Sequence, residues 1–225
     1  HMNFTIASDL AADVADRLEY SIRAALAERG AAWLALAGGR TSPPVFRRLS
    51  ERIGDWSNVL AVPTDERWVP HHHPDCNLAA AKAAFADVRG LRWVTLTPAE
   101  AAGVVDAIPA EEALALHPEP FDVVLLGMGA DGHFASLFPG ADNLTLALDP
   151  AQPKAALAIV PRPMPSAGPF PRITLSLSRL LNSRRVVLAI SGEDKRATLE
   201  RAYANGFPVA ALIEHCPNLE VVWSA

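Results

Sequence analysis

Short apolar runs alternate with helix-like patterns along most of this chain, and this alternation limits the fold more than any other feature of the sequence. The runs lack the strict polar–apolar alternation of half-exposed strands, which favours strands covered on both faces. We expect strands over residues 33–37, 59–63, 93–96, 121–126, 173–177, 185–191 and 219–223. Strands that alternate with helices predict an α/β fold with a mostly parallel sheet flanked by helices.

The helix signals lie between these runs. Apolar residues recur every fourth position from Leu10 to Leu26, which is typical of an amphipathic helix. We expect Ser8 to cap this helix, Asp9 to favour its positive end and Gly30 to end it. Further helices are expected over residues 43–53, 77–85 and 193–204, with a helical region opening at Thr97-Pro98. The proline-rich segment 139–171 predicts irregular backbone.

Length and composition set the remaining limits. Half of the 225 residues are apolar, so we expect one domain over residues 3–225, after His1-Met2 as a cloning remnant. A net charge of −5 without a basic stripe argues against nucleic-acid binding. We see neither an apolar run of about 20 residues that would span a membrane nor a signal peptide. Cys76 and Cys216 have no paired spacing, so we expect a reduced, cytoplasmic protein.

Three loops follow strand ends, where ligands bind in parallel sheets. The first contains Gly38, Gly39, Arg40, Thr41 and Ser42. Two glycines let the backbone approach a ligand, and the following helix begins with free N–H groups. This loop favours phosphate binding, although a plain strand-to-helix turn would have the same glycines.

The second loop contains Asp65, Glu66 and Arg67. In extended backbone Asp65 and Arg67 project to one side and Glu66 projects to the other. An Asp and an Arg at one strand end would orient a base or bind an anionic transition state. A solvated ion pair is the alternative interpretation.

The third loop, Gly127–Gly132, has the G-x-G-x-x-G pattern of dinucleotide-binding folds. That pattern expects a long helix and an acidic residue about 20 positions later, at the end of the next strand. Pro139-Gly140 would stop any helix after barely two turns, and Asp149 has no strand before it. We therefore interpret Gly129 and Gly132 as part of a substrate or oxyanion loop.

His133 follows this loop directly. Histidine side chains exchange protons near neutral pH, which suits a general base. Asp131 either shapes the turn or contacts the ligand, and a core or capping role for His133 stays open. Lys195 lies at another strand-to-helix junction, and Arg172 precedes the strand expected from Ile173. Both would complete an anion site, although each taken singly is more typical of a surface charge.

A metal site is not expected. The run His71-His72-His73 cannot direct all three rings at one ion in regular backbone, and no nearby Cys or paired carboxylate has ligand spacing. We therefore predict neither a metal nor a cofactor.

Several blocks of the chain match one known family together. They are Gly38–Thr41, Asp65–Pro70, His73–Asn77, Leu126–Gly140, Arg172–Leu175 and Ser191–Lys195. In combination they resemble the 6-phosphogluconolactonase family, which belongs to a larger group that includes glucosamine-6-phosphate deaminase. The resemblance implies a modified Rossmann-like fold.

The resemblance also implies an activity, the hydrolysis of 6-phospho-D-glucono-1,5-lactone to 6-phosphogluconate in the pentose phosphate pathway. His133 would be the base that activates water, with Asp65 and Arg67 beside the lactone. The Gly38–Ser42 loop would hold the phosphate together with Lys195 and Arg172. We expect a small-molecule substrate only, and a monomer or a weak homodimer.

Two other functions stay open. An amino-sugar-phosphate isomerase or deaminase would use the same phosphate loop, but that family has a segment resembling Ala-Phe-Asn-Glu-Pro where this chain has Ala135–Pro139. A non-enzymatic sugar-phosphate sensor would normally carry a DNA-binding segment, for which no residues remain. Phe134, Cys76 and the additional Ser42 differ from the usual family pattern.

Overall fold

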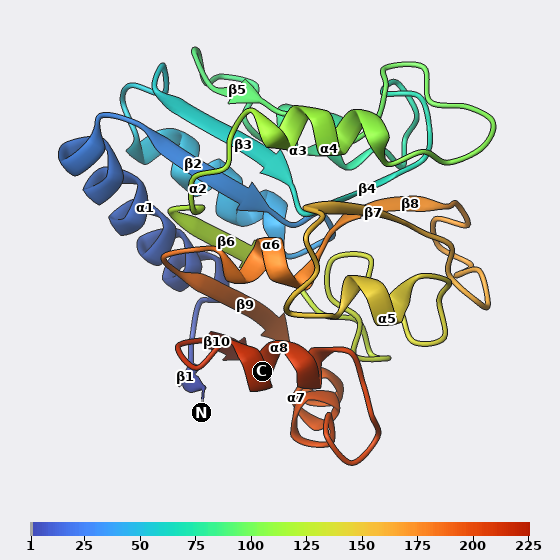
Figure 1. Ribbon diagram of the computed structural model, residues 1–225. Helices are drawn as coiled ribbons and strands as arrows, with labels where there is room; N and C mark the ends of the chain where they lie inside the picture. Colours follow the sequence, from blue (N-terminus) through green and yellow to red (C-terminus); the bar gives the residue numbers. More distant parts are fainter. Residues whose placement is uncertain (1) are drawn as a thin grey trace.

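A parallel sheet of seven strands forms the centre of the protein, in a computed structural model that describes residues 2–225. The strand order is β1-β10-β9-β6-β2-β3-β5, and all neighbouring strands run parallel. These strands are β1 (Asn3–Ile6), β2 (Ala32–Leu36), β3 (Val59–Pro63), β5 (Arg92–Trp93), β6 (Val123–Leu126), β9 (Val186–Ser191) and β10 (Glu220–Ser224). The predicted α/β fold with a mostly parallel sheet is confirmed (Figure 1).

Helices cover both faces of this sheet. They are α1 (Leu10–Arg29), α2 (Ser42–Arg52), α3 (Asn77–Ala84), α4 (Ile108–Ala115), α5 (Leu144–Ala147), α6 (Leu177–Leu181), α7 (Glu193–Glu200) and α8 (Val209–His215). Buried side chains of α1, α2 and α3 form one core with the sheet, whereas those of α4, α6, α7 and α8 form a second core with its other face.

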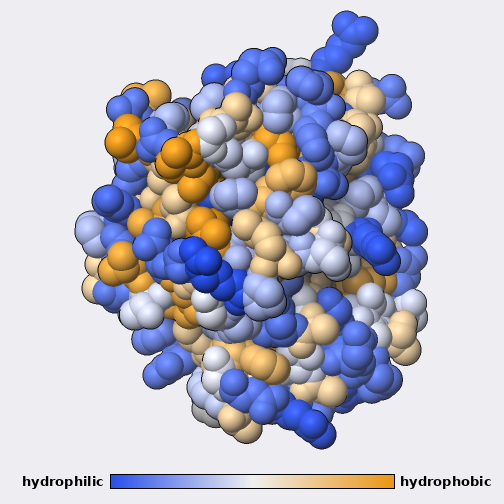
Figure 2. All heavy atoms as spheres, turned by 90° about the vertical axis from the view of Figure 1, so that its right-hand side faces the viewer, coloured by the Kyte–Doolittle hydropathy of each residue, from blue (hydrophilic) through white to orange (hydrophobic). Residues whose placement is uncertain are grey.

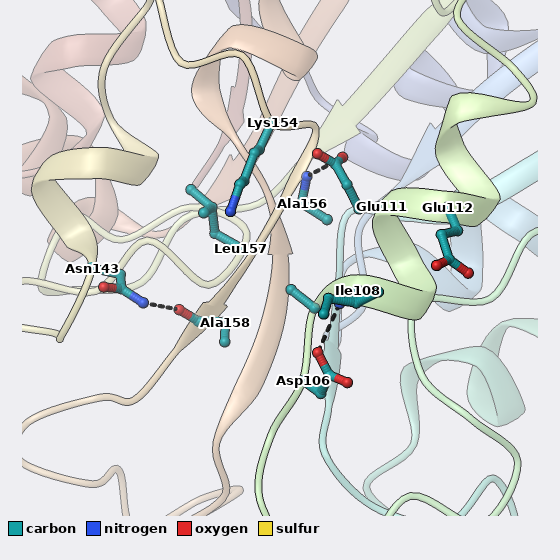
Figure 3. A pocket seen from close by; sticks show the side chains of 10 residues that line it. Asp106, Ile108, Glu111, Glu112, Asn143, Lys154, Ala156, Leu157 and Ala158 are labelled. Carbon is teal, nitrogen blue, oxygen red and sulfur yellow. Dashed lines mark hydrogen bonds between the residues drawn. The ribbon is translucent and has the colours of Figure 1, made fainter.

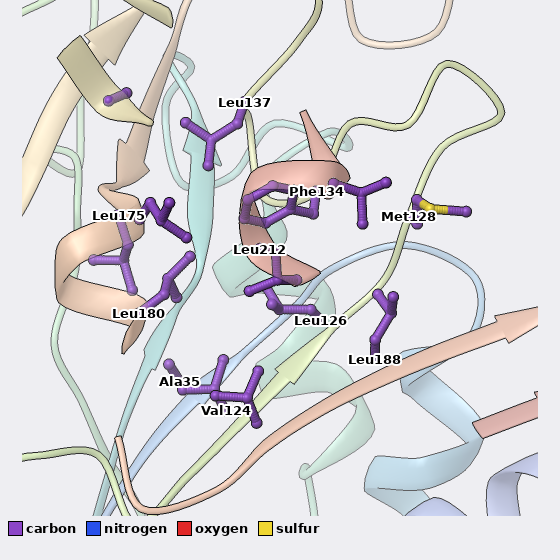
Figure 4. Close-up of a cluster of buried hydrophobic side chains, with 14 of the residues drawn as sticks. Ala35, Val124, Leu126, Met128, Phe134, Leu137, Leu175, Leu180, Leu188 and Leu212 are labelled. Carbon is purple, nitrogen blue, oxygen red and sulfur yellow. The ribbon is translucent and has the colours of Figure 1, made fainter. Parts of the chain in front are cut away.

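The two cores arise because side chains along a strand point alternately to opposite faces. Ala35, Val124 and Leu126 face the second core, next to Phe134 and the other apolar side chains shown in Figure 4. Their neighbours in the chain face the first core. A shift of one residue in register would move each of these side chains into the opposite core, where the packed shapes would no longer match.

A second, antiparallel sheet has the order β4-β8-β7 and lies beyond the carboxyl ends of the parallel strands (Figure 1). Its strands are β4 (Asp65–Arg67), β7 (Ala156–Ile159) and β8 (Arg172–Leu175). The strand expected over 173–177 is therefore not part of the main sheet, and its last residue begins α6. The expectation of irregular backbone over 139–171 is partly wrong, since α5 and β7 lie there. The alanine-rich run of β7 becomes a strand because β8 pairs with it.

Two helix starts differ from those that the sequence predicts. Asp9, and not Ser8, caps α1: its side chain accepts a hydrogen bond from the backbone N–H of Ala12 at 3.1 Å. No helix begins at Thr97-Pro98. The next helix begins at Ile108 and has a proline in its first turn. Strand β1 was not predicted and pairs with β10 at the sheet edge. In the part of the chain described, no helix is long and apolar enough to cross a membrane.

The open edge of β7 borders a hollow of about 380 Å³ next to α4 (Figure 3). Two side chains form hydrogen bonds with the backbone of this edge: Glu111 accepts from the N–H of Ala156, and Asn143 donates to the carbonyl of Ala158. Such contacts reduce the tendency of an edge strand to pair with another chain. Figure 2 shows this end of the molecule as mostly hydrophilic, with apolar residues gathered towards the left of the view.

Candidate active site

The loop between β2 and α2 forms one wall of a cavity beside the carboxyl ends of β2, β6 and β9. All five residues from Gly38 to Ser42 line this cavity, whose volume is about 630 Å³. Pro43 and Pro44 lack N–H groups, so the first turn of α2 offers fewer donors than most helices. Within residues 2–225, no group accepts a hydrogen bond from the backbone N–H groups of Gly38–Ser42. These donors are available to an anion.

Gly38 is needed for a packing reason. A Cβ atom at this position would lie 2.6 Å from Oδ1 of Asn77, the first residue of α3. Asn77 in turn donates from Nδ2 to the carbonyl of Asp65 at 3.0 Å. The Gly38–Ser42 loop, α3 and β4 therefore meet at one amide side chain.

Strand β4 presents its residues as the two-residue period predicts. Asp65 and Arg67 line the cavity, and Arg67 donates from Nη1 to the carbonyl of Asp75 at 2.9 Å. Glu66 points away and is almost fully buried. Among residues 2–225, these two cavity-facing charges form no ion pair with each other: Arg67 bonds to the Asp75 carbonyl, and Asp65 accepts from hydroxyl groups.

Glu66 joins β4 to the start of α3. Its carboxylate accepts hydrogen bonds from the backbone N–H groups of Asn77 at 2.7 Å, Leu78 at 2.9 Å and Arg67 at 2.9 Å. Burial raises the pKa of the Glu66 carboxyl, although these N–H donors oppose the shift. Sequence reasoning placed Glu66 on the far side of the strand and missed this bracing role.

The glycine loop after β6 holds His133 at the cavity wall. Nδ1 of His133 lies 2.5 Å from Oδ1 of Asp131, which also accepts from the His133 backbone N–H at 3.1 Å. The imidazole ring stacks on Phe138 with 4.1 Å between ring centres. Partial burial would raise the pKa of Asp131, but the hydrogen bonds from His133 dominate and lower it.

The two inner glycines of this loop are sterically required. A Cβ at Gly129 would lie 2.2 Å from Cε1 of His133, and one at Gly132 would lie 2.4 Å from Cβ of Phe207. Gly132 also has a φ of 77°, which favours glycine. The residues after Gly132 form turns and no helix, in agreement with the argument against a dinucleotide fingerprint.

Lys195 lies in the first turn of α7, in contact with the glycine loop after β6. Its ammonium group donates to the carbonyl of Met128 at 2.6 Å and lines the cavity. The cavity lining thus contains three cationic side chains, from Arg40, Arg67 and Lys195, against two carboxylates, from Asp65 and Asp194. This balance favours an anionic ligand.

Three predicted site residues do not line the cavity: Asp131, Gly132 and Arg172. Asp131 forms hydrogen bonds with His133, and Gly132 packs closely against Phe207. Arg172 is buried and donates from Nη1 to the carbonyls of Gly168 at 2.9 Å and Phe170 at 2.8 Å. Burial lowers the pKa of its guanidinium. The position of Arg172 gives no support to a phosphate contact.

Of the three departures from the family pattern, Ser42 lines the cavity, whereas Phe134 and Cys76 do not. Phe134 is fully buried in the core, and Cys76 lies with its Sγ 3.6 Å from Oε2 of Glu66. The rings of His71 and His73 bond to the Thr97 carbonyl and the Asp75 N–H respectively. Among residues 2–225, no group of three or more His, Cys, Asp and Glu side chains is placed to hold a metal ion.

Comparison with known proteins gives a consistent result. The sequence profile of the family described as glucosamine-6-phosphate isomerases/6-phosphogluconolactonase matches residues 6–223. A 6-phosphogluconolactonase of Mesorhizobium japonicum is 42% identical over 97% of this chain and 91% of its own length. One of Pseudomonas putida is 37% identical over 97% and 88%. The crystal structure of a 6-phosphogluconolactonase from Shewanella baltica has a TM-score of 0.89, with 31% identity over 100% of this chain and 98% of that chain.

Proposed function

Since this chain belongs to the family of glucosamine-6-phosphate isomerases and 6-phosphogluconolactonases, we propose that it hydrolyses 6-phospho-D-glucono-1,5-lactone to 6-phospho-D-gluconate. This is a step of the oxidative branch of the pentose phosphate pathway. The observation that favours this activity over the family's isomerase or deaminase activity is the identity of the relatives. Those aligned over nearly the whole chain, at 42% and 37% identity, are 6-phosphogluconolactonases.

The phosphate group of the substrate would bind at the Gly38–Ser42 loop. The unpaired backbone N–H groups of this loop, the Arg40 guanidinium and the Lys195 ammonium all line the same cavity. Charge-assisted hydrogen bonds from such groups to phosphate oxygens are about twice as strong as neutral ones. They bind substrate and transition state alike, and therefore act mainly on KM.

His133 would act as the general base. The ionised carboxylate of Asp131 accepts from Nδ1, so the hydrogen lies on Nδ1 and the lone pair on Nε2. Nε2 can then take a proton from water as the water oxygen attacks the lactone carbonyl. A positioned base typically contributes about 10²–10⁴-fold to the rate.

The negative charge on the carbonyl oxygen needs a hydrogen-bond donor, and the departing ring oxygen needs an acid. Arg67, which lines the cavity beside Asp65, would stabilise the negative charge that develops on the carbonyl oxygen. Protonated His133 would then give its proton to the ring oxygen as the C–O bond breaks. A lactone is an activated ester, so no covalent nucleophile is required.

The test compares two substrates and three proteins. Freshly prepared lactone is incubated at constant pH and acid release is measured against an enzyme-free control, while glucosamine 6-phosphate is assayed for ammonia. Wild-type protein is expected to release acid from the lactone and no ammonia. His133→Ala should lower kcat by about 10²–10⁴-fold, whereas His215→Ala, at the end of α8 and outside the cavity lining, should not.

Ammonia release without lactone hydrolysis would reject the proposed activity. Lactone hydrolysis at full rate by His133→Ala would leave the activity standing and reject the base.

A further inference from the structure

Ser136 connects the segment that follows His133 to strand β4, which carries Asp65. Its side chain is fully buried, and its hydroxyl donates to Oδ2 of Asp65 at 2.5 Å. Its backbone N–H donates to Oγ1 of Thr174 at 3.2 Å. Thr174 is the residue that pairs with Asp65 across β4 and β8. One serine thus connects the segment after His133 to the strand that carries Asp65, 71 positions earlier in the chain.

The segment around Ser136 is held on both sides. Phe134 and Leu137 are fully buried in the core shown in Figure 4. Between them Ala135 lines the cavity in a left-handed conformation, with a φ of 48°, which costs a non-glycine residue about 1–3 kcal/mol. This turn brings Ser136 back from the cavity wall into the interior, so the strained residue and the buried hydroxyl belong to one arrangement.

The Asp65 carboxylate has one hydroxyl donor on each oxygen. Thr64 donates to Oδ1 at 3.2 Å, and Ser136 donates to Oδ2. Two donors on opposite oxygens fix the plane of a carboxylate, and only the remaining lone pairs can face a ligand. Without the Ser136 hydroxyl, only the longer hydrogen bond from Thr64 holds the carboxylate in its plane, and Oδ2 loses its donor.

We propose that Ser136 is a positioning residue for the lactone-hydrolysing reaction: it orients the Asp65 carboxylate and sets its place relative to His133. Ser136 does not line the cavity, so it acts through Asp65 and not on the substrate. This inference rests on the proposed function, because its readout is turnover of the lactone.

The test is a double-mutant cycle with a structural control. Ser136→Ala, Asp65→Ala and the double variant are assayed with the lactone, well below the melting temperature of each protein. Ser176→Ala is the control, since Ser176 is an equally buried serine that caps α6 and donates to the Lys154 carbonyl. Ser136→Cys keeps the shape of serine but donates only weakly, and it carries the test if the alanine variant does not fold.

The expected result separates positioning from stability. Ser136→Ala should lower kcat about 10- to 100-fold with KM close to the wild-type value. It should have no further effect in the Asp65→Ala background, and Ser136→Cys should fall between it and wild type. Ser176→Ala should lower the melting temperature and leave kcat unchanged.

Wild-type kcat in Ser136→Ala or Ser136→Cys would overturn the proposal. A kcat loss from Ser136→Ala that persists in the Asp65→Ala background would also overturn it. So would a fall of kcat in Ser176→Ala, because lost stability alone would then explain the effect of Ser136→Ala. A wild-type protein that does not hydrolyse the lactone would instead reject the proposed function itself.

Discussion

Gly129 offers a direct test of how closely the glycine loop controls His133. Alanine at this position would place its Cβ 2.2 Å from Cε1 and 2.3 Å from Nδ1 of the imidazole. The backbone of Gly129 is not in the left-handed region, so the substitution introduces no backbone strain. The clash with the imidazole ring of His133 is therefore its main effect.

The size of the effect follows from the distances. Ordinary van der Waals contact begins at 3.4 Å, so the ring must move by about 1.2 Å, which is the difference between the two distances. The hydrogen bond to Asp131 and the stacking on Phe138 at 4.1 Å both oppose that movement. A misplacement of about 1 Å in a catalytic group can cost about 10²-fold in rate. We expect Gly129→Ala to lower kcat by about this factor, and no further than His133→Ala does.

The assay is steady-state lactone hydrolysis, corrected for the spontaneous reaction, together with a thermal melt. Gly54→Ala is the matched control, because a Cβ there meets nothing within 4 Å and Gly54 does not line the cavity. Gly54→Ala should melt at or slightly above the wild-type temperature, because alanine restricts the unfolded chain by about 0.4–1 kcal/mol relative to glycine. Gly129→Ala should melt somewhat lower, because the displaced ring weakens its contacts with Asp131 and Phe138. A Gly129→Ala protein with wild-type kcat would refute the reasoning, because the ring would then tolerate the displacement.

Three further predictions concern charge. Lys195→Met should raise KM with little change in kcat, because the ammonium contributes to binding of substrate and transition state alike; a fall in kcat alone, in steady-state kinetics, would contradict this. Glu66→Gln should lower the free energy of unfolding by about 1–3 kcal/mol, measured by urea denaturation, because an amide nitrogen cannot accept from an N–H group; wild-type stability would contradict it. Burial alone would raise the pKa of the Glu220 carboxyl. The hydrogen bonds from Arg185 and Arg17 outweigh this effect, so the pKa of the carboxyl is lowered. Its contribution to stability is therefore present above the ordinary glutamate pKa of about 4.3 and is lost as the pH falls through the lowered value. The melting temperature of Glu220→Gln should lie below wild type at pH 7 and approach it in acid; a constant difference down to pH 3 would argue against this.

Much of the candidate site was predictable from local pattern. The glycines before α2 and after β6 indicated places where the backbone turns tightly, and they line or support one cavity. The two-residue period of extended backbone correctly separated Asp65 and Arg67 from Glu66. The short distance from Gly132 to Pro139-Gly140 argued against a dinucleotide site, and no helix follows the loop.

Other features had no local signal. Strands β4 and β7 are short and lie in segments rich in polar residues or proline, and they are strands because β8 pairs with both. Arg172 is the first residue of β8, and its charge and position predicted a contact with the anionic ligand. Its guanidinium instead donates to the carbonyls of Gly168 and Phe170. A charge pattern cannot distinguish these outcomes, because the competing partners lie in a loop whose path depends on packing.

The alternation of strands and helices, the glycine turns at the strand ends and the residue types that the chemistry needs can all be read from the amino-acid order. They depend on backbone geometry and on periods of two and 3.6 residues, which are local. Packing in three dimensions is what brings Ser136 to Asp65, sets Glu66 against the start of α3 and keeps Arg172 outside the cavity. Each of these contacts joins segments that are distant in the chain or that compete for one partner, and the packed core, not the local pattern, selects among them.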